Sequence, residues 1–291
     1  MKKKIQDFDL HMHTTYCDGK SSAEDMVLAA IEKGLAAVGI SGHSFTPHDT
    51  SYCMSRENTL RYIDEINSLK LKYQDSIRVL LGIELDYYAD TDLSPYDYTI
   101  GSVHYLFNDP KDAEREGIVK FYDWVDVDSD PGDLKLFANN NATGLDHAAR
   151  LYYRTAADIV RKTNCDIIGH FDLITKFNEL RQEDVPSVCR IDTADPDYIK
   201  AWKDAADSIF EDCRDRYKKG FRNRLETLGL LEVGDRPVFE INTGAISRGY
   251  RTSPYPASDQ IEYIRDSGGL LILSSDSHSA STICWAFEEY E

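Results

Sequence analysis

The sequence lacks any apolar run long enough to cross a membrane. A spanning helix needs about 20 consecutive apolar residues, and no stretch of the 291-residue chain approaches that length. The opening Met1-Lys2-Lys3-Lys4 resembles the basic start of a signal peptide. Polar Gln6, Asp7 and Asp9 nevertheless stand where the apolar segment of such a peptide should be. We therefore expect a cytoplasmic protein with no membrane partner.

The chain is also poor in positive charge. It has 33 Lys and Arg residues against 51 Asp and Glu residues, a formal net charge of −18. Such a molecule repels phosphate backbones, and the sequence has no basic patch interleaved with aromatic residues to offset the repulsion. These features disfavour a nucleic-acid-binding protein. A small anionic substrate remains open, because bound metal cations can reverse the sign of the local charge.

Cysteine is sparse and shows no Cys-x-x-Cys spacing. In a chain of this length the six cysteines are expected to be reduced, and either buried or incidental; they are Cys17, Cys53, Cys165, Cys189, Cys213 and Cys284. The sequence also has no internal repeat, low-complexity segment or convincing interdomain linker. Because one α/β barrel commonly needs about this length, we expect residues 1–291 to form a single barrel domain.

Short apolar, strand-like runs alternate with amphipathic helical patterns along most of the chain. This alternation predicts a parallel sheet with crossover helices, and we count seven strands rather than eight. The expected strands lie in the segments 5–10, 36–41, 77–85, 98–103, 166–169, 237–242 and 270–274. The expected helices occupy residues 23–33, 55–73, 146–163 and 257–266.

Two stretches interrupt the alternation: an insertion at about 108–146 and a charged helical excursion at about 193–231. Four aspartates in the insertion loosely resemble a calcium-binding EF-hand loop: Asp126, Asp128, Asp130 and Asp133. The glycine of that loop, Gly132, is out of register, and its closing glutamate is missing. We therefore favour a solvated acidic loop near the mouth of a site over a calcium site.

Metal-capable side chains follow the strand-like runs. His11 and His13 are two residues apart, so on an extended chain both imidazoles point to one face. The full set is His11, His13, Asp18, His43, Glu84, His104, His170, Asp276 and His278. In parallel barrels the functional groups collect at the carboxyl ends of the strands. A structural, hydrogen-bonded role is open for any one histidine, but the shared position of the set favours metal binding.

Six histidines and three carboxylates exceed what a single ion requires. They predict two or three divalent transition-metal ions that share a bridging carboxylate. Mixed imidazole and carboxylate ligation suits manganese, iron or zinc, and the residues do not distinguish among the three.

The chain resembles the PHP superfamily, which is named for polymerase and histidinol phosphatase. The matching motifs are His11-Met12-His13, Ile40-Ser41-Gly42-His43, Gly82-Ile83-Glu84-Leu85-Asp86, Asp97-Tyr98-Thr99-Ile100-Gly101-Ser102-Val103-His104, Ile168-Gly169-His170-Phe171-Asp172-Leu173 and Ser275-Asp276-Ser277-His278. Glu240-Ile241-Asn242-Thr243-Gly244 and Pro254-Tyr255-Pro256 are similar to segments of PHP-type histidinol-phosphate phosphatases. The resemblance implies a distorted (β/α)7 TIM-like barrel, in agreement with the strand count.

The resemblance also implies how the ligands divide among the ions. His11, His13, Glu84 and Asp276 would hold one ion, Glu84 would bridge to a second held by His104 and His170, and Asp18, His43 and His278 would hold a third. Such ions activate a water molecule and clamp a phosphoryl group for in-line attack. Beyond that water, His43 and Asp18 are our candidate catalytic residues, and the general acid is not assigned.

Two arginines are candidates for binding a phosphate dianion, because a guanidinium group donates forked hydrogen bonds. Arg248 follows the sixth expected strand, at the catalytic face, in a segment that resembles the histidinol phosphatases. Arg154 is the weaker candidate. An ordinary surface position is the alternative for both.

The resemblance and the metal-capable set together favour a metal-dependent phosphomonoesterase. The foremost substrate is L-histidinol phosphate, which would give L-histidinol and phosphate in histidine biosynthesis. Another small phosphorylated metabolite is the nearest alternative. A PHP exonuclease is disfavoured by the negative charge, and a non-catalytic metal-binding module is disfavoured because all nine ligand positions are filled. The sequence does not set the oligomeric state.

Overall fold

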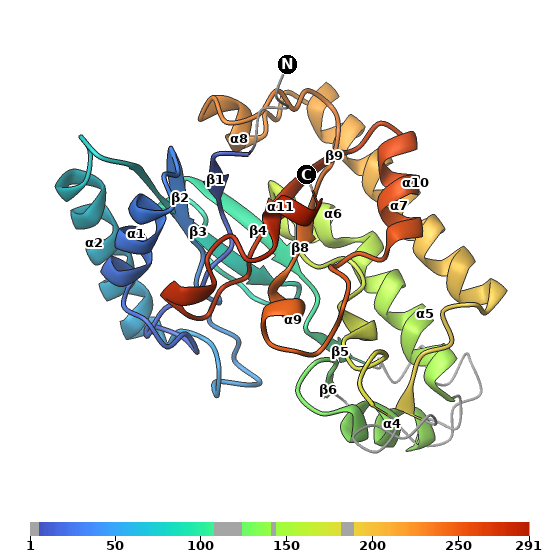
Figure 1. Ribbon diagram of the computed structural model, residues 1–291. Helices are drawn as coiled ribbons and strands as arrows, with labels where there is room; N and C mark the ends of the chain where they lie inside the picture. Colours follow the sequence, from blue (N-terminus) through green and yellow to red (C-terminus); the bar gives the residue numbers. More distant parts are fainter. Residues whose placement is uncertain (1–5, 108–123, 141–143, 182–188, 291) are drawn as a thin grey trace.

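The computed structural model describes residues 6–107, 124–140, 144–181 and 189–290. Within these residues, seven parallel strands pair in the order β1-β2-β3-β4-β7-β8-β9. The first and last of these strands meet through a bridge between Met12 and Ser277, so the sheet is a nearly closed barrel (Figure 1). The predicted (β/α)7 fold class and its strand count are thereby confirmed.

The barrel strands lie close to their expected positions. They are β1 Phe8–Asp9, β2 Ala37–Ile40, β3 Arg78–Asp86, β4 Tyr98–Ser102, β7 Ile167–Ile168, β8 Val238–Asn242 and β9 Leu270–Ser274. The helices are α1 Ala23–Glu32, α2 Arg56–Lys72, α4 Pro131–Asn140, α5 Gly144–Ala157, α6 Ile159–Thr163, α7 Pro196–Lys218, α8 Arg224–Thr227, α9 Gly244–Ser247, α10 Ser258–Asp266 and α11 Phe287–Tyr290, with short 3₁₀ turns η1 Leu173–Thr175 and η3 Ala280–Thr282.

A capping box fixes the start of α1. The Ser22 hydroxyl accepts a hydrogen bond from the Asp25 amide, and the Asp25 carboxylate accepts one from the Ser22 amide. Gly34, with φ of 73°, ends the helical segment, because glycine adopts the left-handed conformation without steric cost.

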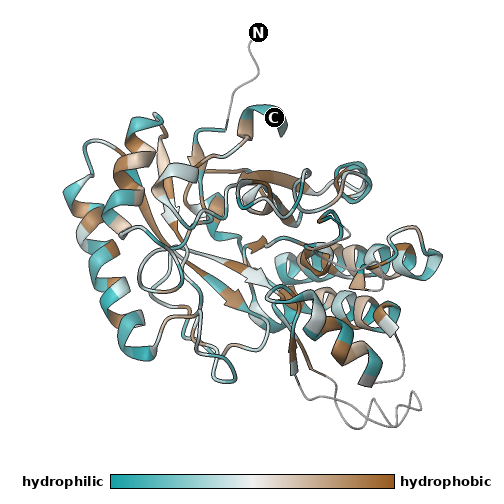
Figure 2. Cartoon of the chain, turned by 60° about the horizontal axis from the view of Figure 1, so that its bottom comes forward, coloured by the Kyte–Doolittle hydropathy of each residue, from teal (hydrophilic) through white to brown (hydrophobic). Residues whose placement is uncertain are grey.

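The helices pack their apolar faces on the outside of the sheet. On α2 the buried side chains Tyr62, Ile66 and Leu69 recur at helical spacing. The Tyr62 hydroxyl contacts the carbonyl oxygens of Ile40 and Gly82 at 2.6 and 2.8 Å, which ties α2 to β2 and β3. Figure 2 shows apolar strands inside and largely polar outer helix surfaces. No helix of the described residues is both long and apolar enough to cross a bilayer.

Tyr98 packs the barrel interior below the carboxyl ends of the strands. Its side chain is fully buried, and its hydroxyl donates to the carbonyl oxygen of Leu10. A Cβ atom on Gly39 or Gly82 would lie 2.2 Å from Tyr98 atoms, so β2 and β3 carry glycine at these positions. This layer of the interior is therefore a packed apolar floor, with the cluster of metal-capable side chains above it.

The two predicted interruptions both contact α5. In the first, β5 Tyr105–Phe107 and β6 Trp124–Asp126 form an antiparallel pair that leads into α4; part of this stretch lies outside the described residues. In the second, α7 runs along α5 (Figure 1). The single helix expected over 146–163 is two helices, because the chain turns at Asp158, whose amide bonds the carbonyl of Thr155 three residues back.

Candidate metal centre

All nine predicted ligand residues lie at the carboxyl end of the barrel. His11 and His13 follow β1, and Asp18 lies in the loop after them. His43, His104 and His170 follow β2, β4 and β7, Glu84 lies within β3, and Asp276 and His278 follow β9. Seven of the nine are buried, whereas the side chains of Asp18 and His278 are 32% and 20% exposed. The cluster therefore opens to solvent on the Asp18 side.

Glu84 occupies the centre of the cluster, with no exposed surface. Its Oε1 atom lies 2.9 Å from His170 Nε2 and 3.2 Å from His104 Nε2. Its Oε2 atom lies 2.9 Å from His43 Nδ1, 3.3 Å from His11 Nε2 and 3.5 Å from His13 Nε2. The two oxygens of one carboxylate thus face different imidazoles, which is the arrangement that a bridging ligand requires.

Asp276 completes the group around His11 and His13. Its Oδ1 atom lies 3.1 Å from His13 Nε2 and 3.7 Å from His11 Nε2. The backbone of Asp276 has φ of 45°, a conformation that costs energy for any residue with a side chain. A Cβ atom on Gly244 would come within 2.8 Å of the Asp276 Cβ atom, so glycine leaves the space that this conformation needs.

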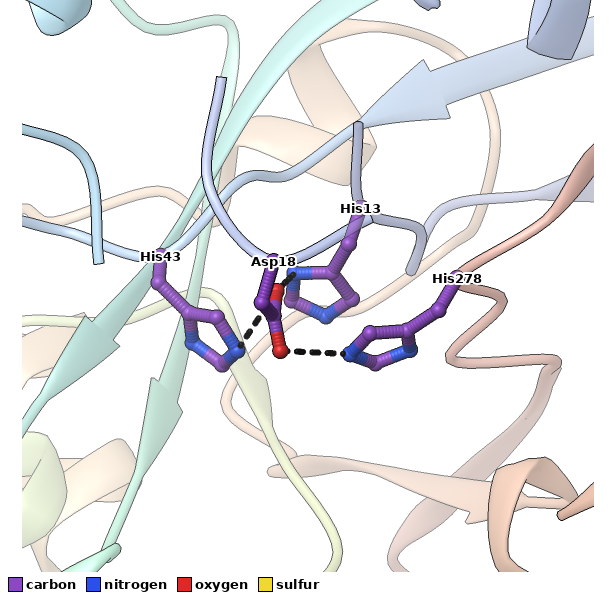
Figure 3. A group of neighbouring side chains, drawn as sticks. All are labelled: His13, Asp18, His43 and His278. Carbon is purple, nitrogen blue, oxygen red and sulfur yellow. Dashed lines mark hydrogen bonds and ion pairs between the residues drawn. The ribbon is translucent and has the colours of Figure 1, made fainter. Parts of the chain in front are cut away.

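A third group surrounds the Asp18 carboxylate (Figure 3). His278 Nε2 lies 3.0 Å from Oδ2, and His43 Nε2 lies 3.7 Å from Oδ1. His13 Nδ1 is also 3.8 Å from Oδ1. His13 therefore faces Asp276 with one ring nitrogen and Asp18 with the other. The resemblance alone had placed His13 in only the first group.

The chemistry of this donor set fits metal ions. His11 Nε2, His13 Nε2 and Glu84 Oε2 are buried and accept or donate no hydrogen bond among the described residues. Buried polar atoms are nearly always paired, and a cation would satisfy all three of these atoms. Three overlapping groups of such side chains have their donor atoms within 4.8 Å of one another. Imidazole with carboxylate is a transition-metal donor set.

The electrostatics favour the ligating forms of two central residues. Burial, helped by repulsion from His43 and His278, lowers the pKa of His13 to about 3, so its imidazole is neutral near pH 7. Burial alone would raise the pKa of Glu84, but the neighbouring His43 and His11 hold it well below its usual range. Neutral imidazole and ionised carboxylate are the forms that bind metal.

A cavity of about 220 Å³ opens beside the cluster. Besides the predicted ligands, its walls include Tyr52, Asp128, Lys176, Arg248 and Tyr250. A larger cavity of about 880 Å³ lies near Asp172 and Glu179 and contains none of the nine ligand residues. Volume alone does not locate chemistry, so we assign the site to the smaller cavity, where the titratable groups converge.

Lys176 is a cavity residue that sequence reasoning missed, and Asp128, expected in an acidic loop near the mouth of a site, lines the same cavity. Lys176 Nζ donates to the Asp128 carbonyl oxygen at 2.7 Å and to its Oδ2 atom at 3.0 Å. Asp128 is therefore not simply part of a solvated acidic loop, as the sequence suggested. Lys176 follows His170 by six residues, on the loop after β7, so its position at the carboxyl end of a strand was the available signal.

The two predicted phosphate-binding arginines lie in different places. Arg248 lines the metal-site cavity, where its guanidinium group donates to Asp276 Oδ2 at 3.0 Å and to the Asp276 carbonyl oxygen at 2.7 Å. Its Nη1 atom is also 3.0 Å from His278 Nδ1. Arg154 is exposed on α5 and lines a separate cavity with Asp197 and Lys200. Because helical periodicity turns Arg154 away from the barrel mouth, we withdraw it from the site.

Comparison with known proteins agrees with this geometry. A Deinococcus radiodurans protein named "Probable histidinol-phosphatase" is 25% identical over 295 residues, covering 97% of this chain and 90% of the relative. A crystal structure of the Listeria monocytogenes protein hisK has a TM-score of 0.72 at 17% identity, covering 98% of this chain and 100% of that chain. Histidinol phosphate phosphatase from Lactococcus lactis, complexed with zinc, L-histidinol and phosphate, has a TM-score of 0.61 at 20% identity, covering 98% and 91%. The family model for the PHP domain matches residues 9–219, so the chain belongs to the PHP family.

Proposed function

We propose that this PHP phosphoesterase is a metal-dependent phosphomonoesterase that hydrolyses L-histidinol phosphate to L-histidinol and phosphate. The observation that carries the proposal is the convergence on one small cavity of seven of the nine metal-capable side chains, all but His11 and His13, and of two cationic side chains, Arg248 and Lys176. The name of the Deinococcus radiodurans relative, similar over nearly the whole chain, supports the substrate. The Lactococcus lactis protein holds both products of this reaction together with zinc, which supports it further.

In this proposal Glu84 is the bridging ligand. Its Oε2 atom, with His11, His13 and Asp276, would hold one ion, and its Oε1 atom, with His104 and His170, would hold a second. Asp18, His43 and His278 would hold a third; the neutral ring of His13 has a single lone-pair nitrogen, so it would serve the first ion alone. When bound, the ions supply a nucleophilic water at neutral pH and neutralise charge on the phosphoryl oxygens.

Arg248 and Lys176 would bind and orient the phosphate. Both are cations on the wall of the cavity, and each is already fixed by a carboxylate partner, Asp276 for Arg248 and Asp128 for Lys176. Fixed donors lose little conformational entropy when an anion arrives. The side chain of Arg248 remains 29% exposed, so part of its guanidinium fork is available to substrate.

The leaving alkoxide needs a proton, and His43 with Asp18 is the candidate pair. His43 lines the cavity, and its Nε2 atom faces the Asp18 carboxylate. If only two ions bind, His43 is free to donate that proton, with Asp18 holding its ring in place. If a third ion binds, both residues are its ligands. The number of ions therefore decides which role the pair has.

The size and charge of the cavity favour a small substrate over a nucleic acid. A space of about 220 Å³ accommodates a small metabolite, and the net charge of −18 repels a polyanion. Asp128 adds a carboxylate to the wall. That carboxylate would pair with a cationic group on the substrate, which L-histidinol provides as its ammonium group.

The test combines metal analysis with a phosphate-release screen. The purified protein is loaded with zinc or manganese and assayed against L-histidinol phosphate, phosphoethanolamine, phosphoserine and p-nitrophenyl phosphate. We expect at least two ions per chain, and kcat/KM for L-histidinol phosphate at least about 100-fold above the other esters. Less than one transition-metal ion per chain under replete conditions contradicts the metal centre. Preference for another phosphomonoester keeps the reaction class but changes the substrate.

A further inference from the structure

Glu240 is a fully buried carboxylate that touches the metal cluster without belonging to the nine ligand residues. It lies within β8, and that strand contributes none of the nine. Its Oε2 atom is 2.9 Å from His11 Nδ1. Its Oε1 atom accepts hydrogen bonds from the His170 amide at 2.7 Å and the Asn242 side-chain amide at 2.9 Å. Burying a charge here is costly, so these contacts call for an explanation.

The contact with His11 settles which ring nitrogen can bind metal. An ionised carboxylate only accepts hydrogen bonds, so the proton of His11 must be on Nδ1. In the neutral, metal-binding form of His11 the Nε2 atom then carries the lone pair, and it faces Glu84 Oε2 at 3.3 Å and Asp276 Oδ1 at 3.7 Å. A carboxylate that holds the far nitrogen of a ligand histidine in this way typically raises metal affinity.

The contact with His170 reaches the second group of ligands. The amide of His170 is fixed by Glu240, and the ring of the same residue lies 2.9 Å from Glu84 Oε1. One side chain on β8 therefore holds His11, which faces one oxygen of Glu84, and His170, which faces the other. The segment from Glu240 to Gly244 matched the histidinol phosphatases in sequence without supplying a ligand, and this arrangement gives it a role.

We infer that Glu240 is a positioning residue, which sets the ligating nitrogen of His11 and the place of His170 so that metal binds on both sides of Glu84. The inference rests on the metal-binding part of the proposed function and adds a residue that acts through the ligands. It is independent of which phosphate ester is hydrolysed.

Glutamine at position 240 tests this role, because its side-chain amide has one accepting oxygen and one donating NH₂ group where glutamate has two accepting oxygens. The Asn242 amide group is fixed in orientation, since its oxygen accepts from the Gly244 amide at 2.9 Å. Two donors, from His170 and Asn242, therefore meet one end of residue 240, and the glutamine oxygen must take that end. Its NH₂ group then faces His11 Nδ1, which forces the His11 proton onto Nε2. A protonated Nε2 has no lone pair for a metal ion.

The experiment measures zinc affinity by competition with a chromophoric chelator, and the melting temperature of the chelator-treated protein. We expect Glu240→Gln to lower zinc affinity about 10- to 100-fold, with a melting temperature near that of the wild type. Glu240→Ala should lower zinc affinity no more than Glu240→Gln, although it removes more packing, because it does not force the wrong proton position. Simple loss of packing predicts the reverse order.

Asp166→Asn is the matched control. Asp166 is an equally buried carboxylate at the other end of the barrel, bonded to Thr99 and Arg224. The same carboxylate-to-amide change there should lower the metal-free melting temperature and leave zinc affinity within about twofold of wild type. Activity is not needed for any of these readouts.

Several outcomes would overturn the inference. Zinc affinity of Glu240→Gln within twofold of wild type would do so, as would a larger loss in Glu240→Ala than in Glu240→Gln. If neither variant folds, ¹⁵N-histidine NMR of the zinc-loaded wild type decides instead. His11 must then show a protonated Nδ1 atom and zinc on Nε2, and the opposite pattern overturns the inference. Failure of the wild type to bind zinc at all would remove the proposed function with it.

Discussion

Asp166 and Glu84 are carboxylates with no exposed surface, at opposite ends of the same barrel. Asp166 precedes β7, where the amide and hydroxyl of Thr99 and the amide and guanidinium of Arg224 donate to it at 2.8–3.1 Å. Its charge is therefore met by donors that the protein itself provides. Glu84 instead faces five imidazoles, and its Oε2 atom has no hydrogen-bond partner among the described residues.

The difference separates a carboxylate that stabilises the fold from one that is prepared for a ligand. Burial of either charge costs several kcal/mol, and at Asp166 the guanidinium group of Arg224 offsets that cost within the protein. Around Glu84 the nearest groups are the Ser102 hydroxyl, which donates to Oε1 at 2.7 Å, and imidazoles whose lone pairs compete with the carboxylate for any proton. Metal cations remove that competition, because they accept lone pairs from the imidazoles and from the carboxylate at once.

The largest expected effect comes from Glu84→Gln. The substitution keeps the shape of the side chain but removes the bridging charge and turns an NH₂ group toward imidazole nitrogens. We expect kcat/KM for L-histidinol phosphate to fall about 10³-fold, the upper range for loss of one preorganised group, and the metal content to fall with it. Phosphate release and elemental analysis measure the two losses. Near-normal turnover in this variant would remove Glu84 as the bridge.

Asp166→Asn should reverse this pattern. The amide would present an NH₂ group to one of the Thr99 or Arg224 donors and leave Arg224 without a counter-charge. We expect the free energy of unfolding of the metal-free protein to fall by about 3 kcal/mol, the scale for breaking a buried ion pair. Urea denaturation followed by circular dichroism measures it. A change of kcat/KM larger than about threefold, in the folded variant, would show that the two ends of the barrel are not independent.

The sequence predicts one end of the barrel better than the rest. Every barrel strand except β8 carries a ligand near or just past its carboxyl end, so locating the strand also locates the ligand, as for Glu84 and His104. This works because a parallel barrel converts positions far apart in the chain into neighbours. The seven strands and the placement of the nine side chains follow from that rule.

Contacts between loops could not be predicted from the positions of the strands. Lys176 meets Asp128 only because the loop after β7 and the stretch after β6 come together in space. Arg154 was misplaced for a related reason, since its helical face depends on how α5 packs against α7. The double contact of His13, with Asp276 and Asp18, depends on rotamers that a sequence pattern does not contain. Sequence periodicity specifies elements, whereas these contacts depend on tertiary packing.

Each end of the barrel has an arginine that pairs with a buried carboxylate: Arg248 at the metal end and Arg224 at the other. Arg248→Ala tests whether the arginine at the metal end also binds substrate. Arg248 pairs with Asp276 but also lines the cavity. We expect KM for L-histidinol phosphate to rise about 10- to 150-fold, equivalent to about 1.5–3 kcal/mol for a charge-assisted hydrogen bond. Metal affinity should fall by less than about tenfold, since Asp276 keeps its histidine neighbours. Steady-state kinetics and chelator competition separate the two effects.

Arg248→Lys is the control for this change. A lysine restores the charge but not the fork, so it should recover little of the lost affinity for substrate. Unchanged kcat/KM in Arg248→Ala would mean that the arginine only supports Asp276, and Arg248 would then leave the substrate site.

Among the substitutions in the site, the smallest expected effect is that of Lys176→Met, which removes a cation from the cavity wall without touching a metal ligand. Methionine keeps most of the apolar stem but loses the ammonium group, which lies 4.7 Å from the centre of the Tyr250 ring. The charge is lost, and Asp128 is left unpaired where it repels phosphate. We expect KM to rise about tenfold, equivalent to about 1.4 kcal/mol. The double variant Lys176→Met, Asp128→Asn should recover part of that loss.

Arg154→Ala is the control, because it removes a cation from the exposed face of α5. It should leave kcat/KM within about twofold of wild type. An equal effect of the two single substitutions would mean that Lys176 acts only through the overall charge of the protein, and the contrast between cavity and surface cations would fail.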